Sequence, residues 1–260
     1  MLETQDLHVT LGRREILRGL DFTASPGTVT AIIGPNGSGK TTLLRALTGE
    51  VPYRGRVNLN GHDIARTPGP RLAGFRAVLA QETHVAFPFT AAEIVRLGLE
   101  AGIGAHDPTL PERLLTEVDL PGYGPRPYHD LSGGEQARVQ LARVLAQARQ
   151  PVTPEGPGWL MLDEPVASLD IAHQLLVMRL AQRFARAGGG VIMVLHDLNL
   201  TAMVADRVLL MAGGRLAAQG APAEVLADTV LQTAFGCAIR ANTAPAEGPW
   251  VLPQSVLTGA

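Results

Sequence analysis

The chain of 260 residues is long enough for one large domain or two smaller ones. Its 22 basic and 24 acidic side chains nearly cancel, which argues against binding to nucleic acid or anionic membranes through bulk charge. No apolar run approaches the roughly twenty residues of a membrane-spanning helix. The acidic N-terminus does not resemble a signal peptide, and the single cysteine, Cys237, fits a reducing compartment. We therefore expect a soluble, cytoplasmic protein.

The first eighty residues have the pattern of strands, turns and one helix. Weak alternation over the first thirty residues favours short strands at a sheet edge. The β-rich run 29–33 predicts a buried strand, and the helical spacing of 41–47 follows it closely. A hairpin-like stretch at 55–61 ends this part.

Helical spacing dominates residues 81–150, with predicted helices at 91–99, 110–118 and 134–148. This predicts a helical insert in an α/β domain.

Strand patterns return after a Pro/Gly-rich connector at 151–158. Predicted strands at 159–162 and 191–195 enclose a predicted helix at 171–187, which favours a right-handed parallel crossover. We expect one domain, with a core formed by 1–80 and 151–235, the insert at 81–150, and a C-terminal tail at 236–260.

A phosphate-binding loop follows the buried strand at 29–33. Lys40, the one lysine among the 22 basic residues, lies in a segment that fits G-x-x-x-x-G-K-[ST]. Glycines turn successive N–H groups inward, and the next helix adds the partial positive charge of its N-terminus. A lysine suits a phosphate as a compact point charge, and a threonine hydroxyl suits Mg²⁺. The predicted nucleotide-binding residues are Gly34, Pro35, Asn36, Gly37, Ser38, Gly39, Lys40, Thr41 and Thr42.

Two carboxylates, Asp163 and Glu164, end the predicted strand at 159–162. The carboxyl ends of parallel strands face a ligand crevice, so Asp163 is expected to hold Mg²⁺ together with Thr41. Glu164 is expected to act as the general base that activates water.

His196 and Gln81 follow other predicted strands. His196 is expected to donate to the γ-phosphate, and Gln81 to contact Mg²⁺ or the attacking water. Taken alone, His196 is better explained as an ordinary surface histidine, and a single glutamine such as Gln81 is a weak signal. None of the seven histidines has paired metal-ligand spacing, so none is expected to bind a metal or haem.

A second glycine-rich helix start lies about ninety residues beyond the first. Ser132 is a good N-cap and Glu135 completes a capping box, but neither explains the adjacent Gly133 and Gly134. Paired glycines let an anion approach a helix N-terminus, which predicts a second phosphate site. One nucleotide does not need two such sites from one chain, so this site is expected to serve a partner subunit.

In this order the motifs resemble those of the ATP-binding subunits of ABC transporters over nearly the whole chain. They correspond to Walker A at 34–42, the Q-loop at Gln81, the signature at 131–135, Walker B at 160–163 and the switch histidine His196. The D-loop corresponds to 168–170 and includes Asp170. The resemblance implies a P-loop NTPase fold with an antiparallel β edge and a helical signature subdomain. It also implies a head-to-tail dimer in which each ATP lies between Walker A of one copy and the signature of the other, so that the nucleotide cycle drives a permease.

One position departs from the family pattern. The family commonly has an aromatic residue upstream of Walker A that stacks on adenine, and spacing places Leu11 there. We expect adenine to pack on this aliphatic side chain; whether His8 substitutes for the aromatic is left open.

The segment 81–98 is similar to ATPases of iron-chelate and cobalamin importers, and the proline-rich connector resembles that of haemin importers. The resemblance implies ATP-driven haem uptake at the cytoplasmic face of the inner membrane. Its implied partners are a permease dimer and, indirectly, a periplasmic haem-binding protein, without direct haem contact by this chain. A siderophore or cobalamin importer is the alternative, and a soluble ABC ATPase without a permease is a further one. The apolar residues 87–89 are expected either to pack in the insert or to contact the permease.

Overall fold

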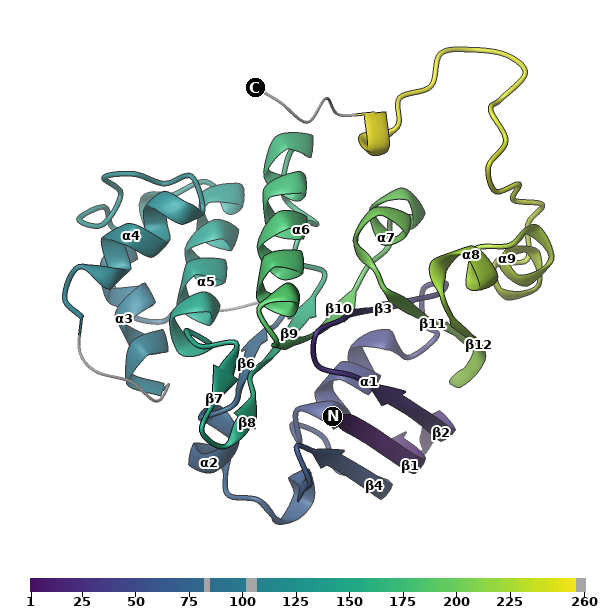
Figure 1. Ribbon diagram of the computed structural model, residues 1–260, viewed down its shortest axis with the longest axis horizontal. Coiled ribbons are helices and arrows are strands. Elements are labelled where there is room, and N and C mark those ends of the chain that lie inside the picture. The colour runs from purple at the N-terminus through teal and green to yellow at the C-terminus, as the bar shows by residue number, and fades with distance from the viewer. Residues whose placement is uncertain (82–84, 102–106, 256–260) are drawn as a thin grey trace.

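The computed structural model describes residues 1–81, 85–101 and 107–255. Two sheets with helices between and around them form the core (Figure 1). None of the helices in these ranges is long and apolar enough to span a membrane.

The larger sheet has the strand order β12-β11-β3-β10-β9-β6. Its parallel strands are β3 (Val29–Ile33), β6 (Arg76–Leu79), β9 (Trp159–Asp163), β10 (Gly190–Val194) and β11 (Arg207–Ala212). β12 (Arg215–Gly220) is an antiparallel edge strand. The expected strand at 29–33 is confirmed, and β9 and β10 are the expected parallel neighbours.

The smaller sheet is antiparallel, with the order β2-β1-β4-β5. Its strands are β1 (Leu2–Leu11), β2 (Arg14–Ala24), β4 (Arg54–Leu59) and β5 (His62–Asp63). β1 and β2 are ten and eleven residues long, so they are longer than the short edge strands expected from the sequence.

Two apolar cores explain why the central strands lack polar positions. On β9, Leu160 and Leu162 face the core shared with helices α3–α7, whereas Trp159 and Met161 face the core shared with α1 and the smaller sheet. Side chains alternate between the faces of a strand, so a strand covered on both faces is apolar throughout. α1 (Lys40–Leu47) lies between the sheets, while α6 (Ile171–Arg186) and α7 (Leu198–Val204) cover the other face (Figure 1).

A three-helix group lies at one side of the larger sheet (Figure 1). It consists of α3 (Ala91–Ala101), α4 (Leu110–Glu117) and α5 (Gly133–Gln147), close to the predicted bounds. A 3₁₀ turn at Tyr128–Asp130 leads into α5, whose capping box between Ser132 and Glu135 is confirmed.

The connector at 151–158 is a small hairpin, β7 (Val152–Thr153) and β8 (Gly156–Pro157), and not an irregular loop. The Asn60 side chain holds its end, donating to the Pro157 carbonyl at 2.8 Å and accepting from the Trp159 indole at 3.0 Å.

The remaining elements are short. They are the 3₁₀ turn Ile64–Arg66 and helices α2 (Gly69–Ala73), α8 (Pro222–Val225) and α9 (Asp228–Phe235). From α9 the tail returns to α7, where Gln254 Nε2 donates to the Asn199 carbonyl at 3.1 Å near the 3₁₀ turn Pro253–Ser255 (Figure 1).

Candidate nucleotide site

Four predicted site segments meet because they follow neighbouring parallel strands. Gly34 follows β3, Gln81 follows β6, Glu164 follows β9, and His196 follows β10. The strand order places the ends of β3, β10, β9 and β6 side by side. Ligands bind at this carboxyl edge in open α/β sheets.

The loop between β3 and α1 has a backbone that only glycine allows at two points. Gly34 has a φ of 147°, and a Cβ there would lie 2.2 Å from the Met211 carbonyl oxygen. Gly39 has a φ of 101° and lies against Leu17. Other residues would strain the backbone or displace β11. The glycines therefore fix how the loop enters α1.

The loop contains buried polar groups of the kind that a phosphate satisfies. The Lys40 ammonium is buried and donates to the carbonyls of Gly34 at 2.9 Å and Pro35 at 3.2 Å, and its burial lowers its pKa. The Ser38 hydroxyl is buried without a hydrogen-bond partner. A buried unpaired hydroxyl is unfavourable, so an anion at this helix N-terminus would supply a missing acceptor.

Asp163 lies beside the first turn of α1. It is 4% exposed, and its carboxylate accepts from the Thr41 hydroxyl at 3.4 Å. Burial raises the pKa of Asp163 to about 6. The Thr41 hydroxyl, the Asp163 carboxylate and the Gln81 amide oxygen are hard oxygen donors and fit Mg²⁺. Within the described part of the chain, no group of three His, Cys, Asp or Glu residues could hold a metal, so this donor set needs phosphate oxygens to complete it.

Asp163→Asn is expected to stabilise the nucleotide-free protein by about 3 kcal/mol near pH 7.5, because the rise in pKa from 3.8 to about 6 reflects the free-energy cost of the buried charge, at about 1.4 kcal/mol per pKa unit. The folded state binds more protons than the unfolded state between these pKa values, so stability falls as pH rises through this window. The gain should be full above about pH 6 and vanish below about pH 4. The free energy of unfolding of the wild type and of Asp163→Asn, measured with urea at pH 7.5 and below about pH 4, tests this. A variant that is less stable than the wild type at pH 7.5 would contradict it.

Glu164 lies between Gln81 and His196, the two residues that the sequence alone indicated only weakly as site residues. Its Oε2 accepts from Gln81 Nε2 at 3.0 Å, and its Oε1 lies 2.5 Å from His196 Nε2. Glu164 has a φ of 49°, in the left-handed region that costs a non-glycine residue about 1 kcal/mol. Strained backbone of this kind is concentrated at functional sites. The structure thus places Gln81, Glu164 and His196 together.

A pocket of about 610 Å³ joins this cluster to the phosphate loop. The predicted residues that line it are Asn36, Gly37, Gly39, Lys40, Thr41, Thr42, Gln81, Glu164 and His196. Arg14 and Ile16 of β2 also line it, and neither is distinguished by the sequence. Leu11 ends β1 and does not line this pocket, whereas Arg14 and Ile16 of the next strand do, so the lining does not support the expectation that adenine packs on Leu11.

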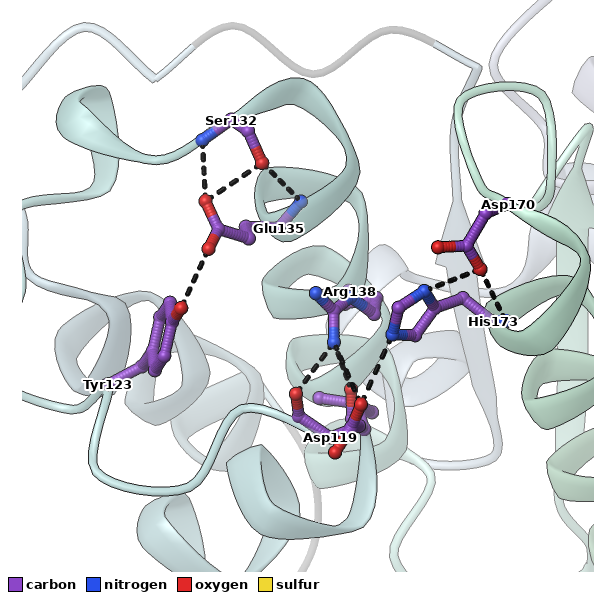
Figure 2. Close-up of polar contacts among 8 residues, drawn as sticks. Asp119, Tyr123, Ser132, Glu135, Arg138, Asp170 and His173 are labelled. Carbon is purple, nitrogen blue, oxygen red and sulfur yellow. Dashed lines mark hydrogen bonds and ion pairs between the residues drawn. The ribbon is translucent and has the colours of Figure 1, made fainter.

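The second glycine-rich segment lies outside this pocket. Ser132, Gly133, Gly134 and Glu135 start α5, and Asp170 caps α6; none of them lines the pocket. Hydrogen bonds from Ser132 and Tyr123 hold the Glu135 carboxylate and lower its pKa to about 2 (Figure 2). A Cβ on Gly133 would meet nothing within 4 Å, so its own chain does not require this glycine.

A polar network that was not predicted from the sequence joins α5 to the start of α6 (Figure 2). Arg138 of α5 donates to the Asp119 carbonyl at 2.6 Å, and the Asp119 carboxylate lies 3.2 Å from His173 Nε2. The other ring nitrogen of His173 lies 2.8 Å from Asp170. An aspartate three residues before His173 is a common N-cap, so the contact between Asp170 and His173 has a local signal in the sequence. The contact between Asp119 and His173 joins residues 54 positions apart and has no such signal. The network ties the second glycine-rich helix to the segment around Asp170.

Of the two roles expected for residues 87–89, packing in the insert holds for Phe89, and contact with the permease stays a prediction. Phe89 packs against the core, whereas Phe87 is 66% exposed. Residues 82–84, which belong to the segment 81–98 and include His84, lie outside the described residues, and so does His106.

Comparisons with known proteins match almost the whole chain. A family model described as ABC transporter matches residues 17–167. A hemin import ATP-binding protein HmuV from Roseobacter denitrificans is 55% identical over 255 residues, covering 98% of each chain. A protein of the same name from Mesorhizobium japonicum is 52% identical over 260 residues, covering 98% of this chain and 99% of its own.

A solved structure of a bacterial Atm1-family ABC exporter with ATP bound matches 86% of this chain and 39% of the exporter chain, with a TM-score of 0.74 and 27% identity. The family model spans more than half of the chain, and the two relatives are similar over nearly all of it. The chain therefore belongs to the ABC transporter family.

Proposed function

We propose that this chain hydrolyses ATP and thereby drives haem uptake through a partner permease. The arrangement of Glu164 carries the catalytic part of the proposal, because its carboxylate lies between Gln81 and His196 at the pocket of the phosphate loop. The names of the two relatives, both hemin import ATP-binding proteins, support the choice of substrate.

Lys40 and the inward N–H groups of 34–42 would bind the β- and γ-phosphates. The ammonium already lies against two loop carbonyls, so it needs only a small movement to contact phosphate oxygens. Thr41, Asp163 and Gln81 would hold Mg²⁺, which neutralises phosphate charge when bound. The low dielectric around Asp163 strengthens its attraction to a cation.

Glu164 would accept a proton from the water that attacks the γ-phosphorus, as the bond between this phosphorus and the β–γ bridging oxygen breaks. The β-phosphate leaves with the electron pair of the broken bond. His196, within hydrogen-bond distance of Glu164, would donate to the γ-phosphate and stabilise its developing charge. Gln81 would orient the water through its amide.

A second copy of the chain would complete each site head to tail. The N–H groups at Ser132, Gly133, Gly134 and Glu135 of that copy would face the γ-phosphate, with Asp170 nearby. Two observations support this: none of these residues lines the nucleotide pocket of its own chain, and Gly133 is not needed for packing. The network from Arg138 through Asp119 to His173 would keep the signature helix and the Asp170 segment in register.

A transmembrane permease would supply the membrane part of the importer, with this chain at its cytoplasmic face. The exposed Phe87 fits the contact with the permease better than Phe89, which packs inward. Haem itself would pass through the permease without touching this chain, and a periplasmic binding protein would deliver it.

The test is to purify the chain with its permease in lipid nanodiscs and measure ATP hydrolysis with substrate-binding protein added. Haem-loaded binding protein is expected to stimulate hydrolysis more than the empty protein, and a Phe87→Ala variant should lose this stimulation while keeping its basal rate. Stimulation by a ferric-siderophore or cobalamin-binding protein instead would identify the alternative importer. A rate of ATP hydrolysis that is unchanged by every permease and binding protein would favour the soluble ATPase.

A further inference from the structure

The nucleotide pocket extends beyond the phosphate loop to β2, where Arg14 and Ile16 line it. Ile16 lies against the loop, since its Cγ2 is 3.4 Å from the position of a Cβ on Gly39. Neither residue takes part in the phosphate chemistry described above. Their side of the pocket is therefore available to another part of the nucleotide.

No Phe, Tyr or Trp of the described residues lines this pocket, and the His196 ring that does line it is held 2.5 Å from the Glu164 carboxylate, in the cluster at the strand ends. Leu11, where the family commonly has an aromatic residue, is 40% exposed and lies outside the lining. His8 also lies outside it, with its two ring nitrogens each 2.9 Å from a carboxylate, of Asp6 and of Glu15. His8 therefore does not replace the missing ring.

The Arg14 side chain is free to bind a ligand. It forms no hydrogen bond or ion pair with any residue in the described ranges, whereas Arg18 of the same strand lies 3.9 Å from Glu15. A planar guanidinium stacks on aromatic faces and gains cation–π attraction from them.

The placement of the other groups sets the direction of the nucleotide. Gln81, Glu164 and His196 form one cluster at the strand ends, which would take the terminal phosphate in the proposed function. Lys40 and Thr41 at the start of α1 take the phosphate chain. The base then extends towards the lining that remains, which is formed by β2.

We propose that Arg14 holds the nucleobase by stacking its guanidinium on the ring, with Ile16 as an apolar contact beside it. This inference rests on the proposed ATP-binding function and assigns its base-binding residue. A stacking contact senses the face of the base and not its edge, so it does not distinguish one purine from another. The chain should accept ATP and GTP with affinities within about threefold.

The test compares Arg14→Ala with Arg13→Ala in titrations with fluorescent N-methylanthraniloyl derivatives of ATP and GTP. Arg13 is in the same hairpin and carries the same charge, but it does not line the pocket. Arg14→Ala should weaken the binding of both nucleotides about fivefold, consistent with a cation–π contact, and Arg13→Ala should change it less than twofold. Arg14→Tyr should restore the affinity, because its ring also stacks.

Competition with inorganic tripolyphosphate separates base contact from phosphate contact. Its affinity should be the same in the wild type and in Arg14→Ala; an equal loss for tripolyphosphate would overturn the proposal. A preference for GTP that disappears in Arg14→Ala would also overturn it, since that result indicates hydrogen bonding to the base edge. If the wild type binds no nucleotide, the proposed function itself fails, whereas equal binding by the two alanine variants refutes only the role of Arg14.

Discussion

Replacing Glu164 with glutamine is expected to reduce ATP hydrolysis at least about 100-fold while leaving ATP binding intact, because general-base catalysis contributes roughly 10²–10⁴-fold. The amide keeps the size of the side chain and can still contact Gln81 and His196, which flank the carboxylate at 3.0 and 2.5 Å. It does not accept the proton of the attacking water. Phosphate release under single-turnover conditions, beside an ATP-binding titration, measures the two effects separately.

Glu155→Gln is the matched control for this substitution. Glu155 is a carboxylate of the β7–β8 hairpin that forms an exposed ion pair with Arg71 and does not line the nucleotide pocket. Its hydrolysis rate should equal that of the wild type. A Glu164→Gln variant that turns over normally would show that another group takes the proton.

Gly133→Asp is expected to reduce the rate of ATP hydrolysis about 100-fold or more without destabilising the folded chain. A Cβ at Gly133 meets nothing within 4 Å, and an acidic residue is favourable in the first turn of a helix such as α5. In the proposed dimer the same carboxylate would face the γ-phosphate of ATP bound to the other copy. Like charges repel there, and donors to the transition state would be lost. Hydrolysis rate and thermal unfolding temperature are measured together.

The structure offers a matched control at the start of another helix. Gly69 begins α2, and a Cβ there also meets nothing within 4 Å. Gly69→Asp introduces the same charge at the same helical position and should leave hydrolysis unchanged. Loss of activity in both variants, or in neither, would refute the special role of the α5 start.

The sequence predicted those parts of the site whose chemistry is local. The phosphate loop combines a strand, glycines and a helix start within fifteen residues, and the capping box of Ser132 and Glu135 spans one turn. Gln81 and His196 could be assigned to the site only from the order of the motifs along the chain, because each is a single polar residue after a strand. The parallel order of β6, β9 and β10 explains why such distant residues meet at Glu164.

Contacts that depend on how elements pack were not predictable in this way. Arg14 lines the pocket only because β2 passes beside the phosphate loop, and nothing in its neighbours distinguishes it from Arg13. The contact between Asp119 and His173 joins the turn after α4 to the first turn of α6. The hairpin at 151–158 is ordered by Asn60, almost a hundred residues earlier. In each case the information lies in tertiary packing and not in the local sequence pattern.

Sedimentation velocity of Glu164→Gln with and without Mg-ATP tests most directly the claim that two copies bind ATP between them. We expect monomers without nucleotide or with ADP, dimers with ATP, and loss of these dimers when Gly133→Asp is added. The measurement should be repeated with the permease in nanodiscs, using cross-linking between the two ATP-binding subunits. Subunits that stay apart with ATP at every concentration, alone and on the permease, would contradict the account.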